Sequence, residues 1–508
     1  MFIEIIFVAV ICAIAYMKWI NTYWKRRGLI QIEPDLFFGN VRKTIFGDTS
    51  LSTSVLQRYN TFKVANSKHG GIYIFTNPVY MPIDPAIIKN IMLRDFSHFV
   101  NRGSYHTPED ILSMNLVNME NEAWKNLRAK LTPTFTSGKM KMMFETLVEK
   151  TGGLEKAFGE YADSLEPCAV KDVLGRFTTD VIGSCGFGIE CNSLEDPENI
   201  FRKVGKRVIE PKLSKFIFTS LFPWRLLGKL KYKRSGNAVA NFFINLVQDT
   251  IKHRESNRIY RKDFMQLLLE LKNTGTVSDN SEYISQKSTR VTKQGISVNE
   301  IIAQCFIFFV AGFETSSTAM TFALLELAQN QDIQNKLRKE IEDVLLVHDG
   351  KVTYEAVMEM KYLDMVVNEA MRKYPPVPVI SRMCNRRYEV PGTDVVIEKG
   401  IRVHFPVYGL HRDPDYYPNP EVFNPENFSE ENKAKRPEFT FLPFGEGPRM
   451  CIGLRFGLLQ AKVGLISVIR NFNFTLSKRT QFPLKMEKTS TVLSVKGEVW
   501  LDVKRILK

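Results

Sequence analysis

The chain of 508 residues lacks several features that define common protein classes. It has no C-x-x-C or H-E-x-x-H pair, and its seven cysteines are an odd number without regular spacing. These absences argue against a disulfide scaffold and against a zinc site. No glycine–serine or proline-rich linker divides the chain, and no internal repeat is present. We therefore expect one large domain over residues 25–508.

An excess of negative charge is also absent, because the formal net charge is +14. No basic stripe accompanies a recognised nucleic-acid-binding fold, so a nucleic acid is not the expected partner. The basic and aromatic segment 206–234 could instead rest on an anionic membrane surface. Four lysines near Trp124 could meet an acidic protein partner, or could be ordinary solvated charges. These are Lys125, Lys130, Lys139 and Lys141.

Helical patterns dominate the sequence. Residues 70–80 and 390–407 are rich in β-branched and turn residues, which predicts the strands of a small sheet. The stretch 273–295 is rich in Ser, Thr, Asn and Gln, which predicts a solvated loop.

The most informative feature is a cysteine inside the segment F-G-E-G-P-R-M-C-I-G, residues 444–453. Its glycines and Pro448 predict a tight turn, and an apolar, helix-favouring run begins at Ile452. Cys451 should therefore lie at or just before a helix N-terminus, where free N–H groups and the helix dipole stabilise a thiolate.

The neighbours of Cys451 favour a haem-bound thiolate. Gly453 leaves room for a flat ring against the backbone, and Arg449 supplies a cation for a haem propionate. A thiolate ligand pushes electron density onto iron and favours O–O cleavage. The alternatives are a buried free cysteine and a phosphate-binding loop, but the segment lacks the third glycine of such a loop.

A long apolar segment, residues 301–327, predicts a buried helix. Within it, the small Ala311 would let a ring approach the backbone, while Glu314 and Thr315 place an acid and a hydroxyl among apolar residues. Burying a carboxylate without partners is unfavourable. We interpret the two residues as a proton relay. The alternative is a threonine bonded to its own helix and a glutamate facing a water-filled crack.

An acid and a base lie on one helix face at Glu369 and Arg372, and the double proline at 375–376 should end that helix. Such a pair on a surface contributes little to stability.

The N-terminus predicts a membrane anchor over residues 1–24. Residues 2–17 are apolar except for Glu4, and aromatic side chains and the basic residues 25–27 follow. Extending the segment to Trp24 gives enough length to span a bilayer. No small-residue cleavage site follows. The basic cluster predicts a lumenal start and a cytosolic body.

Together, the Cys451 segment, the sequence A-G-F-E-T-S at 311–316 and the E-x-x-R pair resemble motifs of cytochromes P450. The resemblance extends over nearly the whole chain. The segments 131–139 and 441–449 are similar to those of insect microsomal members associated with detoxification. The resemblance implies the P450 fold, mainly α with a small β-rich part, preceded by a transmembrane helix.

The resemblance also implies a haem-binding set. Trp124 and Arg128 match a W-x-x-x-R helix that faces a propionate, and Arg382 and Arg449 match two further propionate-binding arginines. Arg102 is a weaker match, and we expect it to be a solvated surface charge. Haem contacts are also implied for Phe444, Gly453 and Ala311.

In the family, the E-x-x-R pair braces the haem loop with a third, cationic partner. Here Asn427 replaces that cation, and an asparagine cannot form a bidentate ion pair. The brace is either weaker or completed by another residue. The resemblance further assigns substrate-pocket walls to residues 107–119, Phe308, and the segments 377–381 and 489–493.

The implied activity is a haem b monooxygenase at the endoplasmic reticulum membrane, with its body in the cytosol. It would insert one oxygen atom from O2 into apolar small molecules such as plant toxins or insecticides, or into endogenous lipids or hormones. Electrons would come from NADPH through a P450 reductase, and cytochrome b5 is a further candidate partner. A haem-thiolate isomerase or dehydratase and a non-catalytic haem-based ligand-binding protein are the alternatives.

Overall fold

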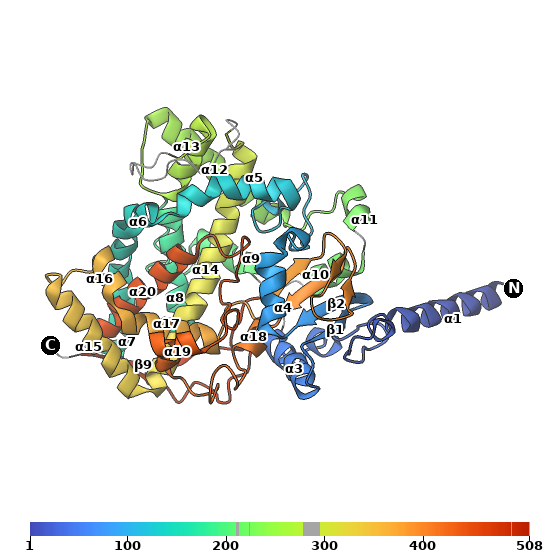
Figure 1. Ribbon diagram of the computed structural model, residues 1–508. Helices are drawn as coiled ribbons and strands as arrows, with labels where there is room; N and C mark the ends of the chain where they lie inside the picture. Colours follow the sequence, from blue (N-terminus) through green and yellow to red (C-terminus); the bar gives the residue numbers. More distant parts are fainter. Residues whose placement is uncertain (210–212, 223, 278–294, 489, 507–508) are drawn as a thin grey trace.

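The long helix α14 (Val298–Gln329) passes through the middle of the body in this computed structural model (Figure 1). The structure describes residues 1–508 except 210–212, 223, 278–294, 489 and 507–508. A capping box starts α14: the Glu300 N–H donates to Ser297 Oγ at 3.2 Å, and the Ser297 N–H donates to Glu300 Oε2 at 2.8 Å. The predicted buried helix and the mainly helical fold are confirmed.

Three other helices pack around α14. They are α8 (Val170–Ile182), α17 (Lys361–Lys373) and α20 (Leu454–Asn471). Each is largely buried, and together they form the core on which the motif residues lie. As predicted, α17 ends just before the double proline at 375–376.

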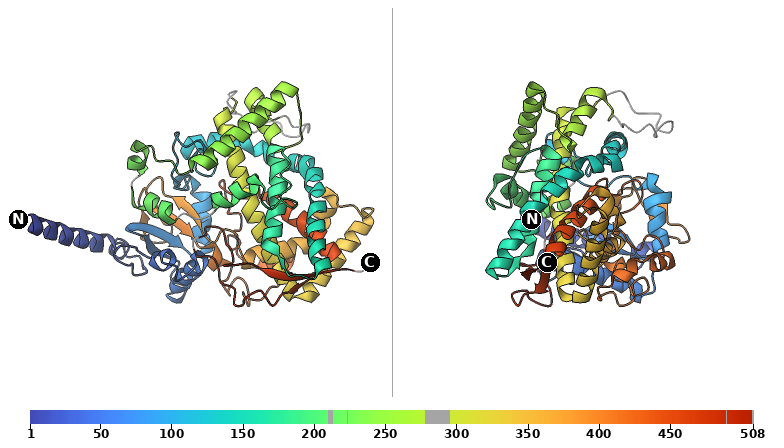
Figure 2. Two further views of the ribbon diagram at one scale, coloured as in Figure 1. Left: turned by 180° about the vertical axis from the view of Figure 1, so that it is seen from behind. Right: turned by 90° about the vertical axis from the view of Figure 1, so that its left-hand side faces the viewer.

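The remaining helices cover this core, as two further views show (Figure 2). They are α2 (Arg42–Ile45), α3 (Leu51–Val64), α4 (Pro85–Lys89), α5 (Asn121–Leu131), α6 (Ser137–Glu149), α7 (Thr151–Ser164), α9 (Ile200–Ile209), α10 (Leu213–Leu221), α11 (Trp224–Lys229), α12 (Asn237–Asn257), α13 (Phe264–Thr274), α15 (Gln331–Val347), α16 (Tyr354–Glu359), α18 (Val407–Leu410) and α19 (Glu430–Lys435). Most of the predicted loop 273–295 lies outside the described residues.

A four-stranded sheet has the order β1-β2-β7-β4. Its strands are β1 (His69–Ile74), β2 (Asn77–Pro82), β4 (Ile380–Met383) and β7 (Arg402–Phe405). β1–β2 and β4–β7 are antiparallel, whereas β2–β7 is parallel. Three of these strands, β1, β2 and β7, lie largely in the predicted β regions 70–80 and 390–407. The register pairs Arg382 with Val403 of β7, which places Arg382 on the edge strand β4.

Two smaller sheets complete the fold. β3 (Cys168–Ala169), β9 (Trp500–Arg505) and β8 (Phe472–Leu476) form one, and β5 (Tyr388–Glu389) and β6 (Val396–Ile397) form the other. The first of these sheets pairs the C-terminal strand β9 with β3, which directly precedes α8.

The N-terminal helix α1 (Phe2–Ile20) projects away from the body with no buried residue (Figure 1). Its 19 residues have a mean hydropathy of 2.1, long and apolar enough to cross a membrane. The helix ends at Ile20, earlier than the predicted limit. Trp24 is fully buried, and its indole N–H donates to the Ile72 carbonyl at 3.4 Å. Trp24 therefore belongs to the body and not to a membrane-facing aromatic belt.

Candidate haem site

Cys451 lies in a tight turn held by backbone contacts. Its N–H donates to the Phe444 carbonyl oxygen at 2.9 Å, and α20 begins three residues later at Leu454. Gly447 has a φ of +74°, and a Cβ there would lie 2.0 Å from the Met92 carbonyl oxygen. Only glycine fits this position. The placement of Cys451 just before a helix N-terminus is confirmed.

The groups around the Cys451 sulfur act in opposite directions on its pKa. Burial raises the pKa of the thiol, while the Gly453 N–H and the charges of Arg102 and Arg128 lower it. Of the described atoms, only Phe135 would lie within 4 Å of a Cβ added to Gly453, at 3.8 Å. The backbone next to the sulfur therefore leaves space for a flat ring.

The three arginines predicted to meet haem propionates, Arg128, Arg382 and Arg449, form one cluster with Arg102. Burial lowers the pKa of Arg382 well below its usual value, and the like charges of Arg102 and Arg449 lower it further. Burial and repulsion by Arg102 and Arg128 lower the pKa of Arg449 to about 9, against the opposing effect of Glu120. Such a cluster is unfavourable without an anion.

Unused donors in the cluster fit a haem with two propionates. Among the described residues, Arg102 Nε and Arg382 Nε are buried and have no hydrogen-bond partner. Arg382 is 1% exposed, and its Nη1 donates only to the carbonyl of the adjacent Ser381, at 2.9 Å, in the part of the chain described. Donors that are buried and unpaired suit an anionic partner.

Arg102 corrects one expectation. It was expected to be a solvated surface charge, but its Nη2 donates to the Arg449 carbonyl at 3.2 Å and burial lowers its pKa. The cysteine turn that encloses it lies 347 residues further along the chain. Local sequence could not reveal this burial.

Arg449 has a different set of partners from the one predicted. Its guanidinium group donates to main-chain carbonyls of Val100, Leu116 and Met119 at 2.8, 3.2 and 2.6 Å. The group also lies 4.1 Å over the ring of Trp124. Arg449 therefore ties the cysteine turn to the segment before α5, and its contact with a propionate stays a prediction.

Arg128 lies one turn after Trp124 on α5, as the W-x-x-x-R spacing predicts. Its Nη1 donates to the Met450 carbonyl at 3.1 Å, next to Cys451. The helix thus contacts the cysteine turn from the side of the cationic cluster.

The predicted brace is present and fully buried. Arg372 Nε and Nη2 donate to the two carboxylate oxygens of Glu369 at 2.7 and 2.8 Å. The amide of Asn427 donates to the same oxygens at 3.2 and 3.3 Å. Asn427 thus occupies the third position of the brace without a charge.

Arg436 supplies a further cation next to the brace. Its Nη1 donates to the Asn427 carbonyl at 2.9 Å, and its guanidinium lies 4.5 Å over the ring of Tyr417. Arg372 lies 5.2 Å from the same ring. One buried aromatic ring therefore contacts both cations, a favourable arrangement for desolvated guanidinium groups.

His411 connects the brace to the chain that enters the cysteine turn. Its Nε2 accepts the Leu442 N–H at 2.8 Å, so its proton is on Nδ1, which donates to the Arg372 carbonyl at 3.2 Å. Arg372 Nη1 donates to the His411 carbonyl at 2.9 Å. The brace thus acts on the turn through His411.

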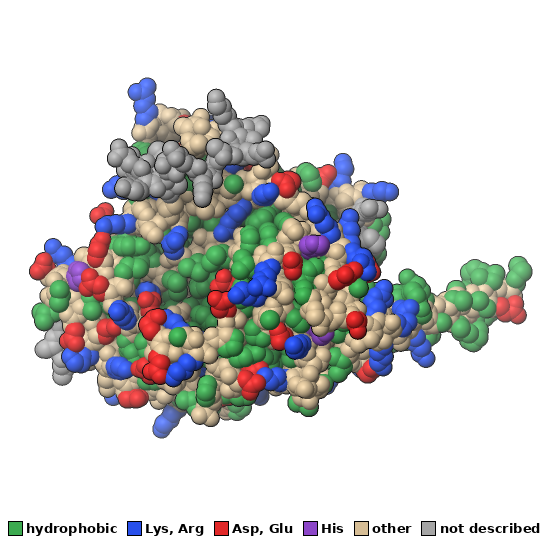
Figure 3. Space-filling view, in the orientation of Figure 1, with side chains coloured by type: hydrophobic (Ala, Val, Ile, Leu, Met, Phe, Trp, Pro, Cys, Tyr) green, Lys and Arg blue, Asp and Glu red, His purple; other side chains and the backbone are tan. Residues whose placement is uncertain are grey.

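The middle of α14 is open, although both of its ends are buried. Ala311 is exposed, and Phe308, Glu314 and Thr315 are partly exposed, whereas residues 316–328 are buried. Figure 3 shows apolar side chains at the bottom of a hollow in one face of the body. Gly312 lets α14 pack closely against α8, because a Cβ at Gly312 would lie 2.5 Å from Ile182 of α8.

Glu314 and Thr315 each have a defined partner. Thr315 Oγ1 donates to the Ala311 carbonyl at 2.6 Å, so the threonine bonds to its own helix. Glu314 forms an ion pair with Lys171 at 3.0 Å, and Lys171 also donates to Ser494 Oγ at 2.6 Å. Sequence reasoning missed Lys171, because it lies on α8, 143 residues before Glu314.

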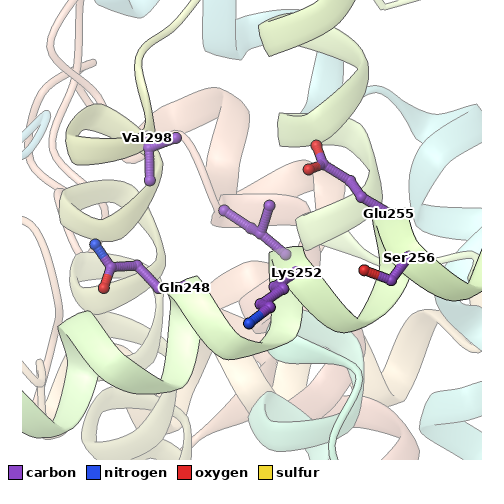
Figure 4. Close-up of a pocket in the computed structure, with 6 residues that line it drawn as sticks. Gln248, Lys252, Glu255, Ser256 and Val298 are labelled. Carbon is purple, nitrogen blue, oxygen red and sulfur yellow. The ribbon is translucent and has the colours of Figure 1, made fainter.

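A surface pocket between α12 and the start of α14 has a volume of about 270 Å³ (Figure 4). Gln248, Lys252, Glu255 and Val298 line it. Ala311 is 13 residues further along α14, about 20 Å away, so this pocket is not the predicted site. Within the described ranges there is no group of three or more His, Cys, Asp or Glu side chains that could hold a metal ion. A single cysteine ligand suits a haem iron.

Comparison with known proteins agrees with this geometry. The family model "Cytochrome P450" matches residues 41–501. Cytochrome P450 6a2 of Drosophila melanogaster is 41% identical, over 98% of each chain. Cytochrome P450 6k1 of Blattella germanica is 40% identical over 96% of this chain and 93% of its own length. Cytochrome P450 6A1 of Musca domestica is 40% identical over 98% and 96%, respectively.

Proposed function

This chain belongs to the cytochrome P450 family and is a monooxygenase of the insect CYP6 group, and from this premise we propose that it oxidises apolar xenobiotics such as plant toxins or insecticides. Endogenous lipids or hormones are the alternative substrates. The open middle of α14 supports an apolar substrate, since Phe308 and Ala311 are accessible there.

The observation that carries the haem-dependent part of the proposal is the cationic cluster beside Cys451, in which Arg102 Nε and Arg382 Nε have no hydrogen-bond partner among the described residues. Family membership implies a haem-thiolate cofactor, and the bound haem would supply the dioxygen and electron chemistry that side chains lack. Cys451 would hold the iron. Arg102, Arg128 and Arg382 would hold the propionates, because Arg102 lies close enough to the other two guanidinium groups to lower the pKa of each.

Glu314, Thr315 and Lys171 would manage protons on the other side of the cavity. The Lys171 side chain is 22% exposed and that of Glu314 is 12% exposed, so water can reach the ion pair. Lys171 holds the Glu314 carboxylate one residue from Thr315. Glu314 would pass protons from solvent, and the Thr315 hydroxyl would present a proton to the cavity after rotating away from the Ala311 carbonyl.

We further propose that the enzyme works on the cytosolic face of the endoplasmic reticulum, with α1 in the membrane. α10 and α11 lie at the end of the body from which α1 projects (Figures 1 and 2). They expose Leu221, Phe222, Leu226 and Leu230 close to Lys229 and Lys231. Exposed apolar groups next to lysines suit an anionic membrane surface. Side chains of several residues of the predicted segment 206–234, Trp224 among them, lie outside the described residues.

A P450 reductase using NADPH is the proposed electron donor, and cytochrome b5 is a further candidate. The four lysines near Trp124 are partly neutralised. Lys141 pairs with Glu355, Lys125 lies 3.8 Å from Glu122, and Lys130 donates to a carbonyl at 3.2 Å. We therefore expect a weaker electrostatic contribution to docking than four free lysines would give.

The test uses the full-length, haem-loaded enzyme with reductase and NADPH under 18O2, against plant toxins, insecticides and insect hormones. We expect products that carry one labelled oxygen atom from the first two groups. Oxidised products without the label would have taken their oxygen from water and would contradict oxygen insertion from O2. Turnover of hormones alone would contradict the xenobiotic assignment while leaving the monooxygenase assignment intact.

A further inference from the structure

The backbone of Leu116 is held from two sides. Its N–H donates to Gln304 Oε1 of α14 at 2.9 Å, and its carbonyl accepts from Arg449 Nη1 of the cysteine turn at 3.2 Å. The two contacts come from positions 188 and 333 residues away. One residue therefore joins α14, the cysteine turn and the segment that precedes α5.

Gln304 is a buried polar residue in an apolar stretch of helix. It is 1% exposed, and its Nε2 donates to the carbonyls of Glu300 and Met114 at 3.2 and 3.5 Å. A buried amide stabilises the fold only when its donors and acceptor are paired. Gln304 meets this condition only with the 113–119 segment in its present place, because Leu116 supplies the donor to Oε1 and Met114 supplies one of the carbonyls.

The 113–119 segment is also fixed internally. Asn115 Oδ1 accepts the N–H groups of Val117 and Asn118 at 3.0 and 3.2 Å, and Asn118 Nδ2 donates to the Ser113 carbonyl at 3.1 Å. Such a segment moves as a unit. Its position relative to α14 depends on the contacts that Gln304 and Arg449 make.

We infer that Gln304 is a positioning residue that fixes the 113–119 segment against α14 and thereby limits the size of the ligand that can approach the iron. The part of this inference that concerns ligands rests on the proposed haem-thiolate function. Val117 and Met119 are only partly buried, and they belong to the predicted pocket wall 107–119. Loss of the Gln304 contact would let the segment retreat and admit bulkier ligands.

The experiment compares two probes that bind haem iron through nitrogen, imidazole and the bulkier 4-phenylimidazole, by difference spectra of the full-length holoenzyme. In Gln304→Leu we expect the affinity for 4-phenylimidazole relative to imidazole to rise about ten-fold. Gln304→Glu should stay near the parent ratio, because a carboxyl group at so buried a position would be protonated and its oxygen can still accept the Leu116 N–H.

Gln329→Leu is the matched control. Gln329 is a glutamine of the same helix whose Nε2 donates to the Leu325 carbonyl of that helix at 3.2 Å. An unchanged affinity ratio in Gln304→Leu, or an equal change in Gln329→Leu, would overturn the inference.

Hydrogen–deuterium exchange of residues 112–118 tests the same contact without any ligand. Exchange of the Leu116 amide should become about ten-fold faster in Gln304→Leu and remain at the parent rate in Gln329→Leu. Unchanged exchange in Gln304→Leu would also overturn the inference. A parent protein that shows no thiolate-haem spectrum would contradict the proposed function, and the exchange comparison would still decide the role of Gln304.

Discussion

The cysteine turn and the middle of α14 are held very differently. On the cysteine side, buried ion pairs and main-chain carbonyls hold the groups in place. Glu369, Arg372, His411 and Arg449 are each buried and make several hydrogen bonds. On the α14 side, Thr315 makes one bond to its own helix, and Glu314 depends on Lys171. The cysteine side suits a permanently bound ligand, and the α14 side suits protons and substrates that bind and leave in each cycle.

The largest effect should follow from removing the sulfur. Cys451→Ala should eliminate the red-shifted Soret band of the reduced, carbon monoxide-bound protein, because that band requires thiolate ligation. Cys305→Ala, at a buried free thiol of α14, is the control and should keep the band. A band that persists in Cys451→Ala would identify another cysteine as the ligand.

Breaking the brace tests whether the cysteine side is held as rigidly as its contacts suggest. Arg372→Met leaves the Glu369 carboxylate buried without its cation, which should cost about 3–5 kcal/mol of stability and release haem. Denaturant unfolding and haem retention measure this. Lys339→Met removes a partner of Asp343 at an exposed ion pair and should change neither quantity. An equal loss of stability in both variants would show that the buried brace contributes no more to stability than an exposed ion pair.

On the α14 side, Thr315→Ala should leave haem binding intact and divert reduced oxygen to hydrogen peroxide. We expect about a ten-fold rise in NADPH consumed per product. Thr321→Ala is a close control, because Thr321 Oγ1 makes the same bond to its own helix, to Ser317 at 2.7 Å, but lies in the buried end of α14. Unchanged coupling in Thr315→Ala would remove this hydroxyl from the mechanism.

The smallest effect concerns the replacement of a cation in the brace. Arg436→Gln should lower stability by about 1 kcal/mol, because it removes the contact with Tyr417. Introducing Asn427→Arg into that variant should restore the lost stability, since a guanidinium would then meet Glu369 directly. Failure of this rescue would mean that Arg436 stabilises Tyr417 and Phe428 and not the brace.

Features within a few residues of each other were predictable from the sequence. The cysteine turn depends on glycines and a proline within ten residues, and the Glu369–Arg372 pair depends on helical spacing. The partners that complete these features were not predictable, because they come from distant positions. Lys171, His411 and Gln304 have ordinary local surroundings, and only the packing of α8, α18 and the 113–119 segment gives them a role. Arg436 could have been suspected from the sequence, because it is a cation close to the neutral Asn427.

For Trp24, the local sequence indicated a position that the structure contradicts. An aromatic residue that follows an apolar run and precedes basic residues is typical of a membrane interface. Its burial against β1 depends on Gly71, which leaves space for the indole: a Cβ at Gly71 would lie 2.2 Å from that ring. A deletion that tests the anchor should therefore remove residues 2–20 and keep Trp24.

The length and apolar character of α14 create a problem during synthesis. With a mean hydropathy of 1.4 it meets the same length and composition criteria for crossing a membrane as α1. While the chain emerges at a membrane already engaged by α1, α14 is a second segment that an insertion machinery could accept, until α8, α17 and α20 cover it. Two of these helices lie after α14 in the chain, so its burial must wait until more than a hundred further residues have been made. Chains that stop soon after residue 330 should therefore expose α14 and accumulate in the membrane as misinserted, degradable products.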